Sequence, residues 1–484
     1  MPFPVIKVSS VLPGSDSAAS GAGPSTAITG TAASTNAAGT TVTLDAGTVL
    51  TGVAIDGSAV IYLADSTLGN RNFASISGTA GSGGATPTVT VNQAFGASLS
   101  GLSWAIGGMR ATVNGTNSGK LFGNNGAAGD AMPGWTVEMQ SGHTESTGQT
   151  LVFRRAGDTT SGPITLRGTP GAATLPILTY TVDASFMLLN VGYIHVSGFE
   201  LQNSAATHAA STALSDAGSV PEQIIGIKIA NSTNKWFKGI SVSTYGVDIR
   251  DCEVANCANI GVSVTGGGGA VIRNCYIHNN TSHGIQLTSG SPLGVLIEGN
   301  IVSANGGDGI QVASGGADNR WTVNILGNTI DGNTSSGIEV TSAIHIKIVN
   351  NILSNNSAYG INLNNTTYTD AWAQASSIFI GNNTYNNTSG AYNSHTASYT
   401  NTTCPWASGD SGLNPSYSAP SSGNYTITNA SLYGQAYPVG GSQYVGNTSI
   451  TYSYSDPGAA QHQASGGGSS GVLFYPGMSG GMNS

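Results

Sequence analysis

The sequence is poor in charge. Only 8% of its 484 residues are charged, and 14 Lys and Arg stand against 23 Asp and Glu, for a formal net charge of −9. A nucleic-acid-binding domain is expected to carry a basic face, so we expect no nucleic-acid partner. Mild acidity in a chain of this size favours solubility and indicates no particular ligand.

Long apolar runs are also missing. The sequence has no stretch of about 18 consecutive apolar residues, and we therefore expect no membrane span. The first residues read Met-Pro-Phe-Pro-Val-Ile-Lys, without a basic region followed by an apolar core. We accordingly expect no signal peptide and no export by the secretory route.

Cysteine is scarce, and its spacing matches no metal site. There is no CxxC pair and no neighbouring His cluster with the spacing of zinc ligands. The sequence therefore predicts no metal and no cofactor. Small buried thiols are one interpretation of the cysteines, and a disulfide stays open as the other. The four cysteines are Cys252, Cys257, Cys275 and Cys404.

What the sequence does contain is a repeat between residues 247 and 383. Each copy includes a phrase that ends in Cys or Asn, which we call the anchor. An Ile stands three residues before every anchor, and a Gly that opens an apolar–polar–apolar triplet stands nine residues after each of the first five. The anchors are 23, 25, 28, 23 and 32 residues apart. They are Cys252, Cys275, Asn300, Asn328, Asn351 and Asn383.

A period in the twenties with short alternating strands predicts a β-solenoid, because no longer run has helical periodicity. Stacked coils pair each strand with its equivalent in the next coil, about 4.8 Å away, and so build parallel sheets. We expect Ile272, Ile297, Ile325 and Ile348 to form one buried column. The anchor asparagines, Asn300, Asn328 and Asn351, are expected to stack inside as an amide ladder.

This repeat resembles the right-handed parallel β-helix of the pectate-lyase superfamily and of bacteriophage tailspikes. The resemblance implies an all-β fold and a right-handed sense, which agrees with the handedness of parallel crossovers. It does not assign a function, because the fold serves lyases, hydrolases, adhesins and inert spikes alike.

The composition divides the chain into five parts. Residues 1–40 are rich in Gly, Ala, Ser and Thr and are expected to form an extended arm. Short β-prone runs in residues 41–110 predict a small β domain for attachment or capping. The β-helix is expected over 111–400, a β cap over 401–455, and a Gly/Ser-rich tail over 456–484.

One coil of the β-helix is expected to carry a long insertion. Phe199 stands where an anchor would, and we take Gly226-Ile-Lys-Ile229 as the triplet of its coil. This assignment leaves residues 207–222 as a protruding loop. Lateral loops of solenoids commonly carry their binding function.

Two sets of side chains are candidates for chemistry on sugars. Weak catalytic candidates are His283, Asp308 and Asp331, because glycoside hydrolysis uses two carboxylates about 5–9.5 Å apart; solvated turn residues are the alternative. The outward residues of the triplets and two aromatic residues are candidates for glycan binding. These candidates are Gln286, Gln311, Glu339, Asn362, Trp321 and Tyr359.

Three classes of function stay open. The first is a bacteriophage virion protein, such as a head decoration, head fibre or tail spike, made in the host cytoplasm and released by lysis. Its partners would be other virion proteins in a homo-oligomer such as a trimer, with the apolar cluster Val472, Leu473, Phe474 and Tyr475 in the tail as an assembly contact. The second is a tailspike that binds or cleaves host polysaccharide. The third is a secreted polysaccharide lyase or an adhesin.

Overall fold

The structure is a computed structural model that divides the chain into two compact units. The first covers Met1–Ser204 and Ala217–Gln223, and the second covers Ala205–Asp216 and Ile224–Met478. The described residues are 5–8, 28–55, 59–64, 73–92, 94–95, 98–106, 113, 133–153, 156–217, 222–230, 235–266, 268–288, 293–313, 322–341, 345–364, 378–394, 397–433, 435–436 and 458–459.

The first unit contains a closed antiparallel barrel with the strand order β2-β3-β6-β5-β4-β7. Its interior is apolar and includes Val42, Ile61, Ile76 and Trp104, and closure leaves no free strand edge. The barrel begins earlier than the sequence indicated, because β2 pairs with both β3 and β7. Its strands are β2 (Ile28–Thr35), β3 (Thr41–Thr43), β4 (Val60–Ala64), β5 (Phe73–Ala80), β6 (Thr88–Val91) and β7 (Leu102–Ile106).

The expectation of an extended arm over residues 1–40 is wrong for two segments. Besides β2, residues Val5–Val8 form β1, which pairs in parallel with β8 (Thr136–Met139). β1 is the outermost strand of a 12-stranded sheet, and Val8 is fully buried. An incomplete coil has an open strand edge, and here the N-terminal strand covers it.

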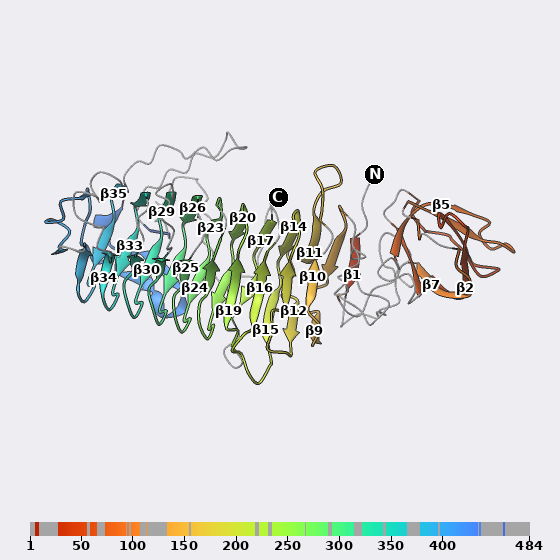
Figure 1. The fold of residues 1–484 in the computed structure, drawn as a ribbon, viewed down its shortest axis with the longest axis horizontal. Coiled ribbons are helices and arrows are strands. Elements are labelled where there is room, and N and C mark those ends of the chain that lie inside the picture. Colours follow the sequence, from red (N-terminus) through yellow and green to blue (C-terminus); the bar gives the residue numbers. More distant parts are fainter. Residues whose placement is uncertain are drawn as a thin grey trace. The chain divides into compact units, whose positions relative to one another are not determined.

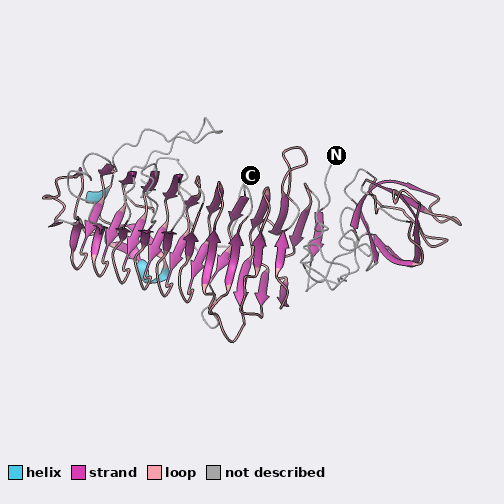
Figure 2. Cartoon of the chain, in the orientation of Figure 1, coloured by secondary structure: helices cyan, strands magenta, loops and turns pink. Residues whose placement is uncertain are grey.

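Three sheets with parallel strands make up the solenoid, and each coil contributes one strand to each sheet (Figure 1). Figure 2 shows that strands dominate, and the described residues contain no α-helix. We name the sheets of 12, 10 and 11 strands A, B and C. Besides β1 and β8, sheet A contains β11 (Ile164–Gly168), β14 (Ile194–Ser197), β17 (Glu222–Ile225), β20 (Val247–Arg250), β23 (Val271–Arg273), β26 (Leu293–Glu298), β29 (Thr322–Leu326), β32 (His345–Val349), β35 (Ile378–Ile380) and β39 (Ala407–Ser408).

Sheets B and C follow the same order along the chain. Sheet B contains β9 (Thr144–Thr147), β12 (Ile177–Tyr180), β15 (Glu200–Asn203), β18 (Lys228–Ile229), β21 (Glu253–Ala255), β24 (Tyr276–His278), β27 (Ile301–Ser303), β30 (Thr329–Asp331), β33 (Ile352–Ser354) and β36 (Asn383–Tyr385). Sheet C contains β10 (Leu151–Phe153), β13 (Met187–Leu189), β16 (Thr212–Asp216), β19 (Lys238–Val242), β22 (Val262–Val264), β25 (Ile285–Thr288), β28 (Ile310–Ala313), β31 (Ile338–Val340), β34 (Tyr359–Leu363), β37 (Gly390–Asn393) and β38 (Ser398–Tyr399). Only the last of these, β38, pairs antiparallel.

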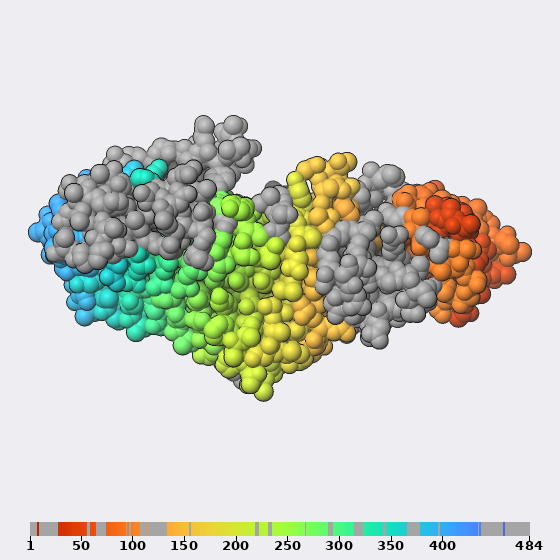
Figure 3. All heavy atoms as spheres, viewed as in Figure 1, coloured from red at the N-terminus to blue at the C-terminus, as the bar shows by residue number. Residues whose placement is uncertain are grey.

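The predicted isoleucine column is confirmed. Ile272, Ile297, Ile325 and Ile348 pair in register along sheet A, and all four are fully buried. The coloured coils present a continuous surface along the stack in the space-filling view (Figure 3). Burying an isoleucine stabilises the folded state by roughly 1.5–3 kcal/mol, so the column is a major part of the core.

The predicted asparagine ladder is also confirmed, with one correction at its end. Asn328 Oδ1 accepts hydrogen bonds from the backbone N and from Nδ2 of Asn300, both at 2.9 Å. Asn351 Oδ1 likewise accepts from the backbone N of Asn328 at 2.8 Å and from its Nδ2 at 2.9 Å. The next rung is Asn382 instead of Asn383, because Asn382 Oδ1 accepts from both nitrogens of Asn351 at 3.1 Å. The sheet A residue of this coil in the isoleucine column is therefore Phe379, which pairs with Ile348.

A second ladder runs parallel to the first and was missed in the sequence. Its asparagines stand five residues after successive rungs of the first column, and their amides bond one another at 2.9–3.0 Å. Stacked amides of this kind satisfy buried turn backbone along the whole stack. The members are Asn280, Asn305, Asn333, Asn356 and Asn387.

Tight turns explain why Asn and Gly recur next to the ladders. The residue before a rung takes a left-handed conformation, as at Asn274 (φ 53°) and Gly299 (φ 64°), which Gly and Asn adopt most readily. The glycine nine residues after the anchor has another cause. A Cβ on Gly309 would lie 2.4 Å from Ile330 Cγ2 and 2.8 Å from the carbonyl oxygen of Gly337, so the coil closes only around a glycine.

The cysteines extend the ladders at their N-terminal ends. Cys275 N donates to Asn300 Oδ1 at 2.9 Å, and Cys257 N donates to Asn280 Oδ1 at 3.0 Å. All four cysteines are buried thiols, and no disulfide joins them in this structure. Burial raises the pKa of the Cys257 thiol to about 12, so this thiol is unreactive at neutral pH.

The expected protruding loop at residues 207–222 is wrong for residues 212–216 and for Glu222, whereas residues 207–211 form a loop between β15 and β16. Thr212–Asp216 form β16 in sheet C, and β17 in sheet A begins at Glu222. The missed anchor is Ile227, which follows Ile224 by three residues and is fully buried. Gly226 looked like the start of a triplet, but its φ of 61° marks the turn before an anchor.

At the C-terminal end of the stack, Asp410 takes the next position in the first ladder, where its Oδ1 accepts from Asn382 N at 2.8 Å. The last described strands cover the outer side of sheet B instead, where Ile427 and Leu432 pack against Ile352. These residues belong to the hairpin of β40 (Tyr417–Ala419) and β41 (Asn424–Ile427), with the 3₁₀ turns η1 (Pro420–Ser422) and η2 (Ala430–Leu432).

Part of the expected tail also touches the coils. Gly458 N donates to the carbonyl of Asn350 at 2.8 Å, and Ala459 N donates to Thr329 Oγ1 at 3.0 Å. The predicted assembly contact at residues 472–475 lies outside the described residues.

Candidate functional site

The outer face of sheet C carries a continuous row of polar side chains. Each member is the central residue of a register-paired triplet, such as Gln311 between buried Ile310 and Val312. Since side chains alternate along a strand, burial of the flanking apolar residues directs the central one outward. We call this set the sheet C row. Its members are Gln286, Gln311, Glu339, Asn362 and Asn393.

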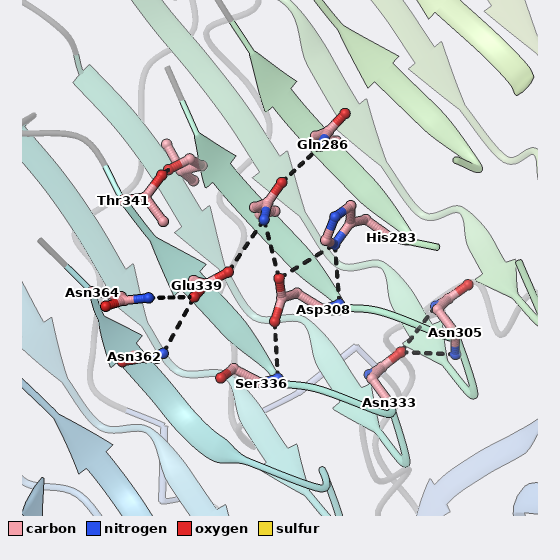
Figure 4. Close-up of polar contacts among 12 residues, drawn as sticks. His283, Gln286, Asn305, Asp308, Asn333, Ser336, Glu339, Thr341, Asn362 and Asn364 are labelled. Carbon is pink, nitrogen blue, oxygen red and sulfur yellow. Dashed lines mark hydrogen bonds and ion pairs between the residues drawn. The ribbon is translucent and has the colours of Figure 1, made fainter. Parts of the chain in front are cut away.

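Direct side-chain contacts link the sheet C row across five strands, and Figure 4 shows those from Gln286 to Asn362. Gln286 Nε2 donates to Gln311 Oε1 at 2.7 Å, and Gln311 Nε2 donates to Glu339 Oε2 at 3.2 Å. Glu339 Oε1 accepts from Asn362 Nδ2 at 3.4 Å, and the amides of Asn362 and Asn393 lie 2.8 Å apart. All five side chains are half-buried, so the row is ordered and still reaches solvent.

His283 and Asp308 meet beside the row, as expected from the sequence. Asp308 Oδ2 lies 3.3 Å from His283 Nδ1, and the same nitrogen accepts the Asp308 backbone N–H at 3.1 Å. Asp308 Oδ1 accepts from Ser336 N at 2.9 Å, and Oδ2 accepts from Gln311 Nε2 at 3.3 Å. Asp308 is only 1% exposed. Its contacts with His283 and Ser336 join the turns of neighbouring coils.

Asp308 and Glu339 form a carboxyl pair that the sequence did not reveal. Burial favours the neutral form of Asp308, but its polar contacts with His283, Glu339 and the Ser336 backbone N–H outweigh burial and lower the pKa of Asp308. Burial and the neighbouring Asp308 raise the pKa of Glu339. The two pKa values are thus driven apart, with Glu339 the member of the pair that holds a proton more readily.

The remaining predicted residues lie elsewhere or outside the described part. Asp331 is in sheet B, where Ser354 Oγ donates to it at 2.7 Å and burial raises its pKa. It does not join His283 and Asp308, and the three-residue site is therefore wrong. Tyr359 begins β34, and its hydroxyl lies 3.0 Å from Ser398 Oγ. Trp321 is not among the described residues.

Within the described residues, no cluster of three or more His, Cys, Asp or Glu side chains is arranged to hold a metal ion. No helix in that part of the chain combines the length and apolarity needed to cross a membrane.

The geometry of the face suits binding better than two-carboxylate catalysis. A glycosidase pair must reach the scissile bond or an attacking water from both carboxyl groups. Both oxygens of Asp308 are engaged by neighbouring groups, and its side chain is 2% exposed. Glu339 is the accessible member of the pair, and its neighbours on the row are amides that can donate and accept hydrogen bonds.

Comparisons with known proteins bear on the fold. Residues 188–405 match the family model described as "Right handed beta helix region". No curated protein sequence matches the chain.

Solved structures with similar folds include pectate lyase Pel9A, at 15% identity over 69% of this chain and 89% of that chain, with a TM-score of 0.48. The A-module of Azotobacter vinelandii mannuronan C-5 epimerase AlgE4 is 14% identical over 53% and 68%, with a TM-score of 0.38. A rhamnogalacturonan lyase is 13% identical over 59% and 83%, with a TM-score of 0.39. At these identities the likeness carries no conclusion about activity. The family match and the three sheets together show that residues 188–405 form a right-handed parallel β-helix.

Proposed function

We propose that this protein binds a polysaccharide along the outer face of sheet C, with the sugar chain running across successive coils. The observation that carries the proposal is the sheet C row, in which polar side chains at equivalent positions link five neighbouring strands. A row of this kind presents alternating donors and acceptors in one line, as a chain of sugar hydroxyls requires.

The spacing of the coils supports a linear sugar polymer as the ligand. Neighbouring strands of a sheet lie about 4.8 Å apart, which is close to the rise of one sugar in an extended glycan. Each coil can therefore contact one sugar. The two buried asparagine ladders hold the coils rigid, and a pre-organised surface loses little conformational entropy on binding.

Binding of the full-length protein to a glycan array tests this proposal, followed by titration calorimetry on the best oligosaccharide. The variant Gln311→Ala removes the central amide of the row and should weaken binding at least about fivefold, the effect of losing one hydrogen bond of about 1 kcal/mol. The matched control is Asn324→Ala, since Asn324 is a half-buried amide on β29 of sheet A. Equal losses in both variants, or no glycan bound at all, would contradict the proposal.

As the setting of this function we propose the exterior of a bacteriophage virion. The support comes from the sequence: low charge, a small β domain before the β-helix, and termini suited to packing against other virion proteins in a homo-oligomer. Mass spectrometry of purified virions tests the setting. Absence of the protein from particles that assemble in its presence would reject it and leave the binding proposal standing.

A further inference from the structure

We infer that the sheet C face accepts neutral polysaccharides and excludes polyuronates and other polyanions. This inference rests on the proposed function and specifies its ligand class. It follows from the distribution of charge over the coils, which differs between the sheets of the second unit.

The described residues of the sheet C face offer no Lys or Arg to an anionic sugar. Strands β25, β28, β31 and β34 and the residue before each glycine of these coils contain no Lys or Arg. The nearest along the sheet is Lys238 of β19, two strands before β25. The charged side chains at the centre of the face are the carboxyl groups of Asp308 and Glu339, with His283 beside them.

The second line of outward side chains on sheet C is uncharged as well. It follows each triplet by one residue and offers hydroxyl and amide groups, as in Thr341 and Asn364, both at least partly accessible to solvent. Asn364 Nδ2 donates to Glu339 Oε1 at 3.1 Å. The line consists of Thr265, Thr288, Ala313, Thr341 and Asn364.

Cations of the same coils lie on sheet A instead. Among the described residues from β20 to β34, every Lys and Arg belongs to that sheet: Arg250, Arg273 and Lys347. Two of them surround Asp248, with Arg273 Nη2 at 3.2 Å and Arg250 Nε at 3.6 Å from its Oδ2. A polyanion drawn to this protein would therefore meet its cations on sheet A.

Recognition of a uronate normally uses Arg or Lys, because their N–H groups pair with the sugar carboxylate. On sheet C that carboxylate would instead approach Glu339 and Asp308, and like charges at an interface oppose binding. A neutral sugar meets no such repulsion. Its hydroxyls can donate to Glu339 and exchange bonds with the amides of Gln286 and Gln311, which are the groups that the row exposes.

The test compares two sets of oligosaccharides of equal length on the full-length protein by titration calorimetry. One set consists of neutral glucans, galactans and mannans, and the other of oligogalacturonates and oligomannuronates. The best neutral oligosaccharide should bind at least about tenfold more tightly than any uronate, a difference that a single unfavourable charge contact produces. Gln311→Ala should weaken that binding at least about fivefold, whereas Arg273→Gln on sheet A should leave it unchanged.

The other outcomes distinguish the inferred ligand class, the position of the site on sheet C and the proposed function. Uronate binding that is as tight as neutral binding and is lost in Gln311→Ala would overturn the inference and keep the site on sheet C. Uronate binding that is lost in Arg273→Gln would move the ligand to sheet A and overturn both the inference and the proposed site. If neither set binds, the proposed function fails, and the ligand class fails with it.

Discussion

The substitution Asn328→Asp tests the ladder that holds the β-helix together. Asn328 is fully buried. Its Nδ2 donates to the carbonyls of Ile297 at 3.0 Å and Leu326 at 3.2 Å and to Asn351 Oδ1 at 2.9 Å. An Asp at this position replaces the donor with an acceptor, so three acceptors that were bonded would face a carboxyl oxygen.

The expected loss of stability follows from these contacts. An ionised Asp would be a buried charge without a partner, which costs about 3–5 kcal/mol. A protonated Asp could donate to one of the three acceptors, while Asn351 Oδ1 keeps its bond from Asn328 N and the Leu326 carbonyl keeps its bond from Gly299 N; the lost bonds then cost about 1–3 kcal/mol in all. The ionised state would thus cost a large part of the roughly 5–15 kcal/mol that stabilises a typical domain, and the protonated state a smaller part.

The assay is the unfolding rate in guanidinium, followed by circular dichroism, because large β proteins often unfold irreversibly. Asn324→Asp is the matched control on the same strand. Asn324 lies on the outward side of β29 and pairs in register with Lys347, so a negative charge there should change stability by no more than about 0.5 kcal/mol. Equal unfolding rates for the two variants would refute the ladder as a source of stability.

Three further predictions concern the ends and the turns of the β-helix. Burial raises the pKa of Asp410 from 3.8 to about 6; the folded state therefore holds this proton more tightly than the unfolded chain, and stability should fall by about 3 kcal/mol as the pH rises from about 4 through 6. Asp410→Asn should remove that loss in melts recorded across this range, and an unchanged pH profile would contradict the assignment. Gly309→Ala places a Cβ 2.4 Å from Ile330 Cγ2 and should cost about 1–3 kcal/mol by overpacking; an unaltered melting temperature would show that the coil can relax. Deletion of residues 465–484 should leave the melting curve unchanged and weaken incorporation into virions, and normal incorporation would remove the tail from assembly.

Sequence periodicity predicted the parts of the fold that repeat without interruption. The Ile and Asn columns were visible because each coil uses the same residue at the same place, as at Ile297 and Asn300. The second ladder had an equally regular signal and could have been found. An asparagine stands five residues after each position of the first ladder from Cys275 onward, and Asn280 is the first of them. The coil anchored at Ile227 was missed because Gly226 forms the turn before that anchor. In the later coils, the glycine used to find the repeat stands directly before the triplet instead.

Contacts that join different columns could not be predicted in the same way. Asp308 stands just before the glycine of one coil, and Glu339 stands two residues after the glycine of the next, so their approach depends on side-chain direction as well as on register. The pairing of β1 with β8 joins segments about 130 residues apart in sequence, and no local pattern specifies the partner of such a strand. Site prediction failed for Asp331 because its column lies on sheet B.

The most direct test of the central claim is the structure of the protein in complex with a neutral oligosaccharide selected by the binding assays. We expect a sugar chain that lies across β25, β28, β31 and β34 of sheet C, with hydroxyl groups within hydrogen-bond distance of Gln311 and Glu339. A sugar bound to sheet A, to sheet B or to the barrel would contradict it.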